Sequence, residues 1–400
     1  MSASTPARLP RDTQRLLVLA EGLARSGSQM EDSYWQNLLG SQLKKILLGK
    51  KSQSIETALD TLLDGDINVY ETLVEHAETH SESLEIEVGG VEYDVLLFTA
   101  PIVAWTRYQL PSGKLTLKQR RALAEQIQQH IAAPDVRVAL APALASFEQL
   151  PQSFQETRQW TQQLAKQALG LASDTLVIRK SADAENILAD VRFLTGALVA
   201  PKGAALFRWQ TTRPDGAFIS REDCHRDWLA GSSEVLVDMF TGCQAEYLLP
   251  DAFYINCREA DKRIRPYALK AAVTWLHTAA HFPPQDLRAV IVGCGERAIE
   301  EYRIGFSSKR DDEVIYGCIW PVLSKEEAAI ETPEIDQVDI PGEIVDLLKE
   351  LGITDIRRLA GVYPIDFCDD CGAPYFPNAL GDMMHPELPE ETDLSPQHFH

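Results

Sequence analysis

The spacing of apolar residues changes at Leu84, and this change is the strongest constraint on how the chain can fold. Before it, apolar residues recur at three- and four-residue intervals, as in Leu16–Leu23, which is the period of an amphipathic helix. From Leu84 apolar and polar residues alternate, Gly89-Gly90 supplies a turn, and an apolar run returns at Val91. The sequence therefore predicts a helical N-terminal segment over residues 1–83, followed by a β-hairpin.

The region after the hairpin predicts an α+β body made of two similar units. Tyr93–Asp135 and Tyr247–Asp286 each contain a strand, a loop, a helix and a strand in the same order. We therefore expect a first α+β unit over residues 84–215 and a second over residues 216–323. The prediction is a duplicated β-α-β body with mixed or antiparallel sheets, in which Pro266 starts the helix of the second unit.

The C-terminal part divides into three segments. Residues 324–340 are acidic and contain a proline, which is typical of a linker. Residues 341–386 are expected to hold a helix that ends at Gly352, a short second helix over Thr354–Ala360, and a zinc-knuckle-like cysteine loop. Residues 387–400 are acidic and rich in proline, which predicts a disordered tail.

Charge and composition exclude several classes of protein. The net charge of −21 argues against general binding of nucleic acid or of an anionic membrane surface, because both repel an acidic protein. The longest apolar runs fall short of the roughly 20 residues that span a bilayer, and the N-terminus lacks the apolar core of a signal peptide. Five of the seven cysteines are scattered singly, which is typical of reduced thiols. We expect a cytoplasmic protein.

One short element near the end of the chain implies specific chemistry. Cys368 and Cys371 are separated by two residues and followed by Gly372, so their sulfurs converge in a tight loop of the kind that holds Zn²⁺. His385 is the expected third ligand. A structural zinc site usually takes four ligands. Candidates for the fourth are Asp366, Asp382, His398, His400, a water molecule or a cysteine of the body.

Two other interpretations of the cysteine loop stay open. A redox role requires the first cysteine at a helix N-terminus, where the helix dipole lowers the thiol pKa. Here a loop with glycine and proline follows, and Asp369 and Asp370 are expected to raise the thiol pKa values. Inert or vestigial thiols are the other alternative. The chain lacks the second cysteine pair of a zinc ribbon, so a metal site here would be three-liganded, completed across a dimer interface, or degenerate.

The basic segment 258–270 is a second candidate site. Its cations precede Pro266, and a helix N-terminus with guanidinium groups can bind a phosphate or a carboxylate. The cations in question are Arg258, Lys262, Arg263 and Arg265, which Arg107, Arg303 and Lys309 would join if the two units packed as a pseudo-symmetric pair. The alternative is that these cations form ordinary ion pairs with the acidic residues around them.

A glycine pattern at residues 293–298 matches a dinucleotide-binding fingerprint. Gly293, Gly295 and Ala298 follow an apparent strand, but the fingerprint needs a full helix next to bind pyrophosphate. Only a few residues separate this pattern from the next strand at Tyr302. We therefore expect a turn between two strands.

Several longer strings resemble a known family. They are Ala100–Tyr108, Leu249–Phe253, Cys257–Tyr267, Glu301–Phe306 and Phe367–Pro374. These strings are similar to the bacterial protein family catalogued as domain of unknown function 2863, and the resemblance extends over roughly Leu9 to Glu391. It implies a bacterial cytoplasmic protein, and it supplies no activity, substrate or catalytic residue.

Taken together, these patterns favour a cytoplasmic binding or interaction protein with a structural zinc-binding loop. Its partner would be another, unknown protein or a second copy of the chain. The alternative is an enzyme or sensor that binds a phosphorylated or carboxylated small molecule at segment 258–270. RNA binding through the zinc loop is disfavoured by the acidic residues that flank it.

Overall fold

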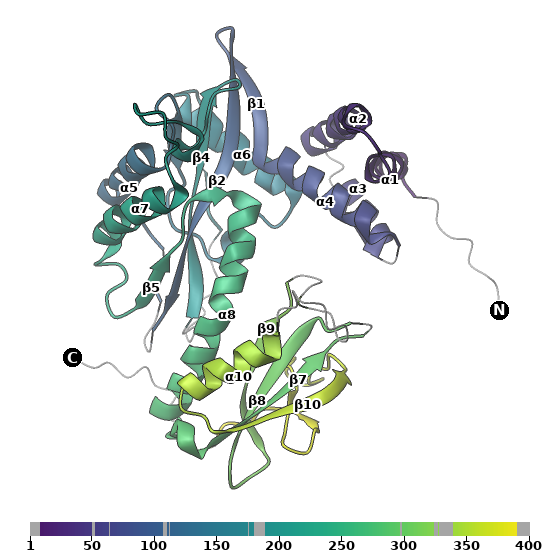
Figure 1. The fold of residues 1–400 in the computed structure, drawn as a ribbon, viewed down its shortest axis with the longest axis vertical. Helices are drawn as coiled ribbons and strands as arrows, with labels where there is room; N and C mark the ends of the chain where they lie inside the picture. Colours follow the sequence, from purple (N-terminus) through teal and green to yellow (C-terminus); the bar gives the residue numbers. More distant parts are fainter. Residues whose placement is uncertain are drawn as a thin grey trace, which may run out of the picture.

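The computed structural model describes residues 9–49, 53–63, 65–106, 110–111, 113–174, 176–179, 189–296, 298–323, 327 and 339–389. Arg107, His398, His400 and most of the predicted linker (324–340) and tail (387–400) lie outside these residues. Figure 1 shows a helical head, a large sheet with helices on both faces, and a smaller sheet that the long helix α8 connects to the large one. In the part of the chain described, no helix is both long and apolar enough to cross a membrane.

Four helices form the head, as the sequence predicted. They are α1 (Arg11–Ala24), α2 (Gln29–Leu48), α3 (Gln53–Leu63) and α4 (Ile67–Glu82). Ser28 begins α2 by accepting a hydrogen bond from the Glu31 amide, which satisfies one of the amides left free at a helix start. The predicted apolar face of α1 is buried in the head's own core.

The predicted hairpin is confirmed and opens the large sheet. β1 (Ser83–Val88) pairs antiparallel with β2 (Val91–Trp105), with Val88 opposite Val91. Gly89 and Gly90 have φ values of 61° and 79°, so both occupy the left-handed region that a two-residue hairpin turn requires.

The large sheet is antiparallel and covered on both faces. Its order is β1-β2-β4-β3, where β3 is Arg137–Leu140 and β4 is Ala189–Pro201. On β2, the side chains of Phe98 and Ile102 share a core with α5 (Leu117–His130) and α7 (Arg221–Leu236). Leu97 and Val103 share the opposite core with α6 (Phe154–Ala168) and the start of α8. This alternation is why β2 is apolar over most of its length.

The small sheet carries the candidate site. Its order is β10-β7-β8-β9, formed by β7 (Leu287–Cys294), β8 (Glu301–Ser308), β9 (Val314–Pro321) and β10 (Asp355–Tyr363). One face packs against α8 and α10 (Ile340–Glu350). β7 and β8 are antiparallel neighbours, with Gly293 in β7 and Gly295 and Ala298 between the two strands, so this glycine pattern lies at a connection between strands, as expected.

Two local predictions were wrong. Pro266 does not start a helix, because α8 runs from Phe253 to Thr278 with the proline inside it. The helix tolerates the lost amide because Phe253 and Ala260 pack in the core of the large sheet, while Leu269 and Leu276 pack in that of the small sheet. The segment predicted as a helix over Thr354–Ala360 belongs largely to β10, which pairs in parallel with the buried strand β7.

The α+β class with mixed and antiparallel sheets is confirmed, but the two expected units do not each form a sheet of their own. β5 (Gln244–Tyr247) and β6 (Asp251–Ala252) pair with β2 of the large sheet. α8 then leads to β7, which begins the small sheet. The similar order of elements in the sequence therefore reflects a helix that joins two different sheets.

Candidate metal centre

The cysteine loop is a tight turn at the end of a short antiparallel arm. Phe367 and Pro374 form a β-bridge, and the Cys368 amide donates to the Ala373 carbonyl at 2.8 Å. The Gly372 amide closes the turn by donating to the Cys368 carbonyl at 2.8 Å. Gly372 has a φ of 72°, a conformation that side chains disfavour, so the glycine after the second cysteine is required for this shape.

A second hairpin brings His385 to the loop. β11 (Phe376–Pro377) pairs with β12 (Met383–Met384), so His385 follows directly after the strand that returns toward the cysteines. The turn between them is held by Asn378, whose Oδ1 accepts hydrogen bonds from the amides of Leu380 and Asp382, both at 2.9 Å. Asn378 is buried, and the sequence alone gave no sign of this role.

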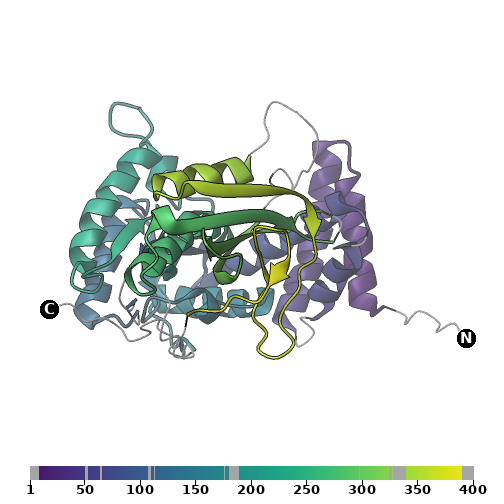
Figure 2. The ribbon, with the colours of Figure 1, turned by 90° about the horizontal axis from the view of Figure 1, so that it is seen from below.

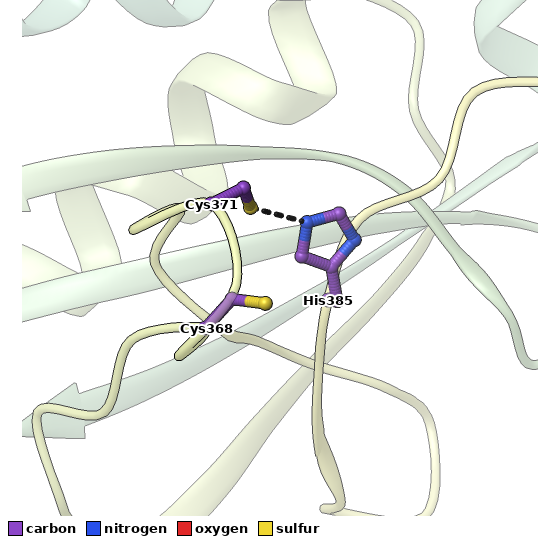
Figure 3. A group of neighbouring side chains, drawn as sticks. All are labelled: Cys368, Cys371 and His385. Atoms are coloured by element: carbon purple, nitrogen blue, oxygen red, sulfur yellow. Dashed lines mark hydrogen bonds between the residues drawn. The ribbon is translucent and has the colours of Figure 1, made fainter.

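The three predicted ligands converge. One ligand atom each from Cys368, Cys371 and His385 all lie within 4.8 Å of one another. Cys371 Sγ is 3.1 Å from His385 Nε2, and Figure 3 shows both sulfurs on the side of the loop that faces the imidazole ring. A tetrahedral Zn²⁺ with Zn–S bonds of about 2.3 Å and Zn–N bonds of about 2.0–2.1 Å separates its ligand atoms by roughly 3.5–3.8 Å. The 3.1 Å distance and the 4.8 Å limit lie on either side of that range, so the three side chains are placed to hold a metal ion.

Backbone amides favour the thiolate form of Cys368. The amides of Cys371 and Asp370 point at its sulfur and lower the pKa of this thiol below its ordinary value. The predicted rise of the Cys368 pKa was therefore wrong, because hydrogen bonds from these two amides lower it. The Tyr375 hydroxyl donates a hydrogen bond to the Cys368 sulfur. Desolvation and this neighbouring sulfur raise the pKa of Tyr375. A thiolate that accepts hydrogen bonds is the form that binds a metal ion.

Arg303 of β8 fixes the base of the loop to the small sheet. Its side chain is fully buried, and its Nη1 donates to the carbonyl oxygens of Asp366 and Tyr375 at 2.7 and 2.8 Å. Its Nε donates to Glu301 at 2.6 Å, and its guanidinium lies 5.2 Å from the centre of the Phe367 ring. Because the two carbonyls flank the cysteine loop on either side, Arg303 ties both ends of the loop to the sheet.

The described residues contribute three ligands and no fourth. Asp366 and Asp382, which the sequence offered as candidates, do not belong to the group of converging side chains. Asp382 lies in the β11–β12 turn, where its amide and carbonyl bond to Asn378. No cysteine of the described body joins the group either, and Cys224 and Cys294 are buried elsewhere. His398 and His400 lie outside the described residues.

The four cations predicted to bind an anion point to different parts of the molecule. Arg258 pairs with Glu78 of the head at 2.7 Å. Arg263 pairs with Glu259 at 3.0 Å. Arg265 is buried and pairs with Glu327 at 2.9 Å, while Lys262 is exposed.

The helix N-terminus that this anion site required does not lie at Pro266. Arg303 and Lys309, the other described cations of the predicted group, donate hydrogen bonds to backbone and side-chain oxygens of their own surroundings. Anion binding itself stays an untested prediction.

One comparison with known proteins finds a match. The family model described as "Protein of unknown function (DUF2863)" matches residues 1–399. The chain belongs to the DUF2863 family. Neither the search of curated proteins nor the search of solved structures gave a significant match. For this DUF2863 protein, function is therefore inferred from the geometry of its own side chains.

Proposed function

We propose that this protein is a cytoplasmic binding or interaction protein whose C-terminal arm is held in shape by a structural Zn²⁺. The observation that carries the proposal is the convergence of Cys368, Cys371 and His385 from two hairpins onto one point. Two thiolates and an imidazole are ligands that zinc prefers, and water is available for the fourth position.

The surroundings of the loop support a structural role for the metal. The arm over residues 366–385 has only a few buried side chains, among them Phe376 and Asn378. A bound metal ion would therefore contribute much of the local stability of the arm. Arg303 and Tyr375 hold the loop in position for the ligands. A redox role has less support, because Cys368 lies in a turn rather than at a helix N-terminus.

Elemental analysis of the purified protein tests the proposal. We expect about one zinc per chain in the wild type and loss of that zinc in Cys368→Ser, together with a lower melting temperature. Cys318→Ser is the matched control, because Cys318 lies outside the converging group, and it should keep its metal. Metal-free wild-type protein, with unchanged melting in Cys368→Ser, would overturn the proposal.

A further inference from the structure

A cavity of about 530 Å³ lies along β9, between helix α8 and the arm that carries the metal site. One wall is formed by three alanines of α8, Ala268, Ala271 and Ala272. The opposite wall belongs to the metal-site arm and includes Pro374 and Pro386, the residue after His385. Gly317 and Ile319 of β9 line the space between these walls. The cavity therefore occupies the position of a further strand beside β9, which is the last strand of the small sheet.

The backbone of β9 presents hydrogen-bonding groups to this cavity. The Pro321 carbonyl points away from β8, since it accepts a hydrogen bond from Arg265 of α8 at 2.9 Å. Antiparallel pairing alternates along a strand, so the amides and carbonyls of Ile319 and Gly317 point to the same free edge. Among the described residues, none hydrogen-bonds to these outward groups.

The chain itself already pairs with the other end of this edge. The Glu387 amide donates to the Val314 carbonyl at 2.8 Å, as a neighbouring strand would. Among the described residues, the segment before Glu387 makes no further backbone hydrogen bond to this edge toward Gly317. Among the residues that the structure describes, the edge of β9 is thus paired at its start and unpaired where the cavity lies.

We propose that the edge of β9 from Gly317 to Ile319 binds an extended, uncharged segment of a partner protein as an added strand. None of the described residues that line the cavity is charged, although the protein carries a net charge of −21. A segment in this position gains backbone hydrogen bonds from the edge, and its alternate side chains face the alanines of α8 and the prolines of the arm. Small apolar side chains fit walls of this kind, whereas charged ones would lose their hydration without a partner.

This inference names the partner of the interaction role proposed above and rests on it. The metal site and the edge can nevertheless be tested apart. Zinc fixes the wall that carries Pro386, whereas the hydrogen-bonding groups belong to β9. Zinc binding with no peptide binding would defeat the inference alone, while peptide binding to a zinc-free protein would defeat the metal proposal alone.

The experiment uses the 400-residue chain and, as the probe, a phage-displayed library of random peptides. Selected peptides are synthesised, and their affinities are measured by fluorescence anisotropy on four proteins. Ile319→Pro removes one edge amide without touching the pairing with β8, and Ile319→Val is its matched control. Ala268→Trp fills the cavity from the opposite wall, so it tests the site even if the proline variant folds poorly.

We expect selected peptides to bind about tenfold more weakly to Ile319→Pro and to Ala268→Trp, and within about threefold of wild type to Ile319→Val. Hydrogen exchange should slow over residues 314–321 when peptide is bound. The inference is overturned if no peptide is selected, or if the selected peptides bind all four proteins equally. The inference is also overturned if an apolar dye binds the wild type and Ile319→Pro equally well but does not bind Ala268→Trp. That result would identify a small-molecule cavity instead.

Discussion

Gly305 of β8 lies directly opposite Gly317 of β9. Because neither residue has a side chain, the metal-site arm can pack close to the backbone of the small sheet. A side chain at residue 305 would collide with the Pro377 carbonyl, and one at residue 317 would collide with the Phe376 ring. Phe376 and Pro377 form β11, the strand that leads from the cysteine loop to the His385 hairpin. Figure 2 shows this arm lying against the strands of the small sheet. Two glycines on neighbouring strands therefore set how closely the candidate site docks.

Gly305→Ala should destabilise the protein. The added methyl group meets backbone, which cannot rotate away as a flexible side chain would, so we expect a loss of about 1–3 kcal/mol in the free energy of unfolding. Chemical denaturation measures this change. Gly27→Ala is the matched control, since nothing lies near its added carbon, and it should stay within about 0.5 kcal/mol of wild type. Equal stability of the two variants would show that β11 does not dock on Gly305.

Arg303→Met should lower the free energy of unfolding by more than the loss of an exposed ion pair does. The substitution leaves the carbonyls of Asp366 and Tyr375 and the carboxylate of Glu301 without their buried donor, a situation that typically costs about 3–5 kcal/mol. Arg25→Met is the control, because the Arg25 and Glu21 side chains are 70% and 47% exposed and their pair is expected to contribute about 0–1 kcal/mol. A loss for Arg303→Met as small as that for Arg25→Met would contradict the anchoring role.

Local signals in the sequence were sufficient for most of the helices and strands. Gly89-Gly90 specified the hairpin turn because both residues need positive φ. Thr116 and Gln119 formed the full capping box at the start of α5, with both reciprocal hydrogen bonds present. The cysteine spacing and His385 identified the candidate site for the same reason: a short segment fixes the geometry of its own ligands.

The remaining features depend on residues far apart in the sequence. Pro266 predicts a helix start by local rules, but tertiary packing of α8 against two sheets decides otherwise. β10 has weak apolar alternation of its own and forms because β7 offers a parallel partner. Arg303 resembles any basic residue in a strand, and its role depends on carbonyls 63 and 72 residues away. Such partners carry no local pattern that a single sequence reveals.

Tyr375→Phe should weaken metal binding without abolishing it. The variant removes the hydroxyl that hydrogen-bonds to Cys368 but keeps the aromatic ring, so the loop retains its packing. Loss of such a partner to a metal ligand typically lowers affinity by about 10- to 100-fold. Competition with a chromophoric zinc chelator measures the affinity, and Tyr93→Phe on β2 is the control. Identical zinc affinities of the two variants would rule out a contribution from the Tyr375 hydroxyl.

Stability should fall as pH rises toward neutrality because of Glu82, which lies between the head and α8. Glu82 Oε2 accepts a hydrogen bond from the Tyr254 amide at 3.0 Å, and burial raises the pKa of Glu82 from 4.5 to about 7. Nearby Glu78 and Asp251 raise this pKa further, and Arg258 opposes them. The folded state therefore holds this proton more tightly than the unfolded state, and the free energy of unfolding decreases as pH rises through this interval.

Glu82→Gln keeps an acceptor for the Tyr254 amide and removes the titration. We expect it to lessen the decline in stability between about pH 5 and pH 8, and to be more stable than wild type at the upper end by on the order of 1–3 kcal/mol. Denaturation at a series of pH values measures this slope. Glu87→Gln, on the exposed end of the hairpin, should keep the wild-type slope. Parallel curves for wild type and Glu82→Gln would show that the carboxyl group of Glu82 ionises in the folded protein as it does in the unfolded chain.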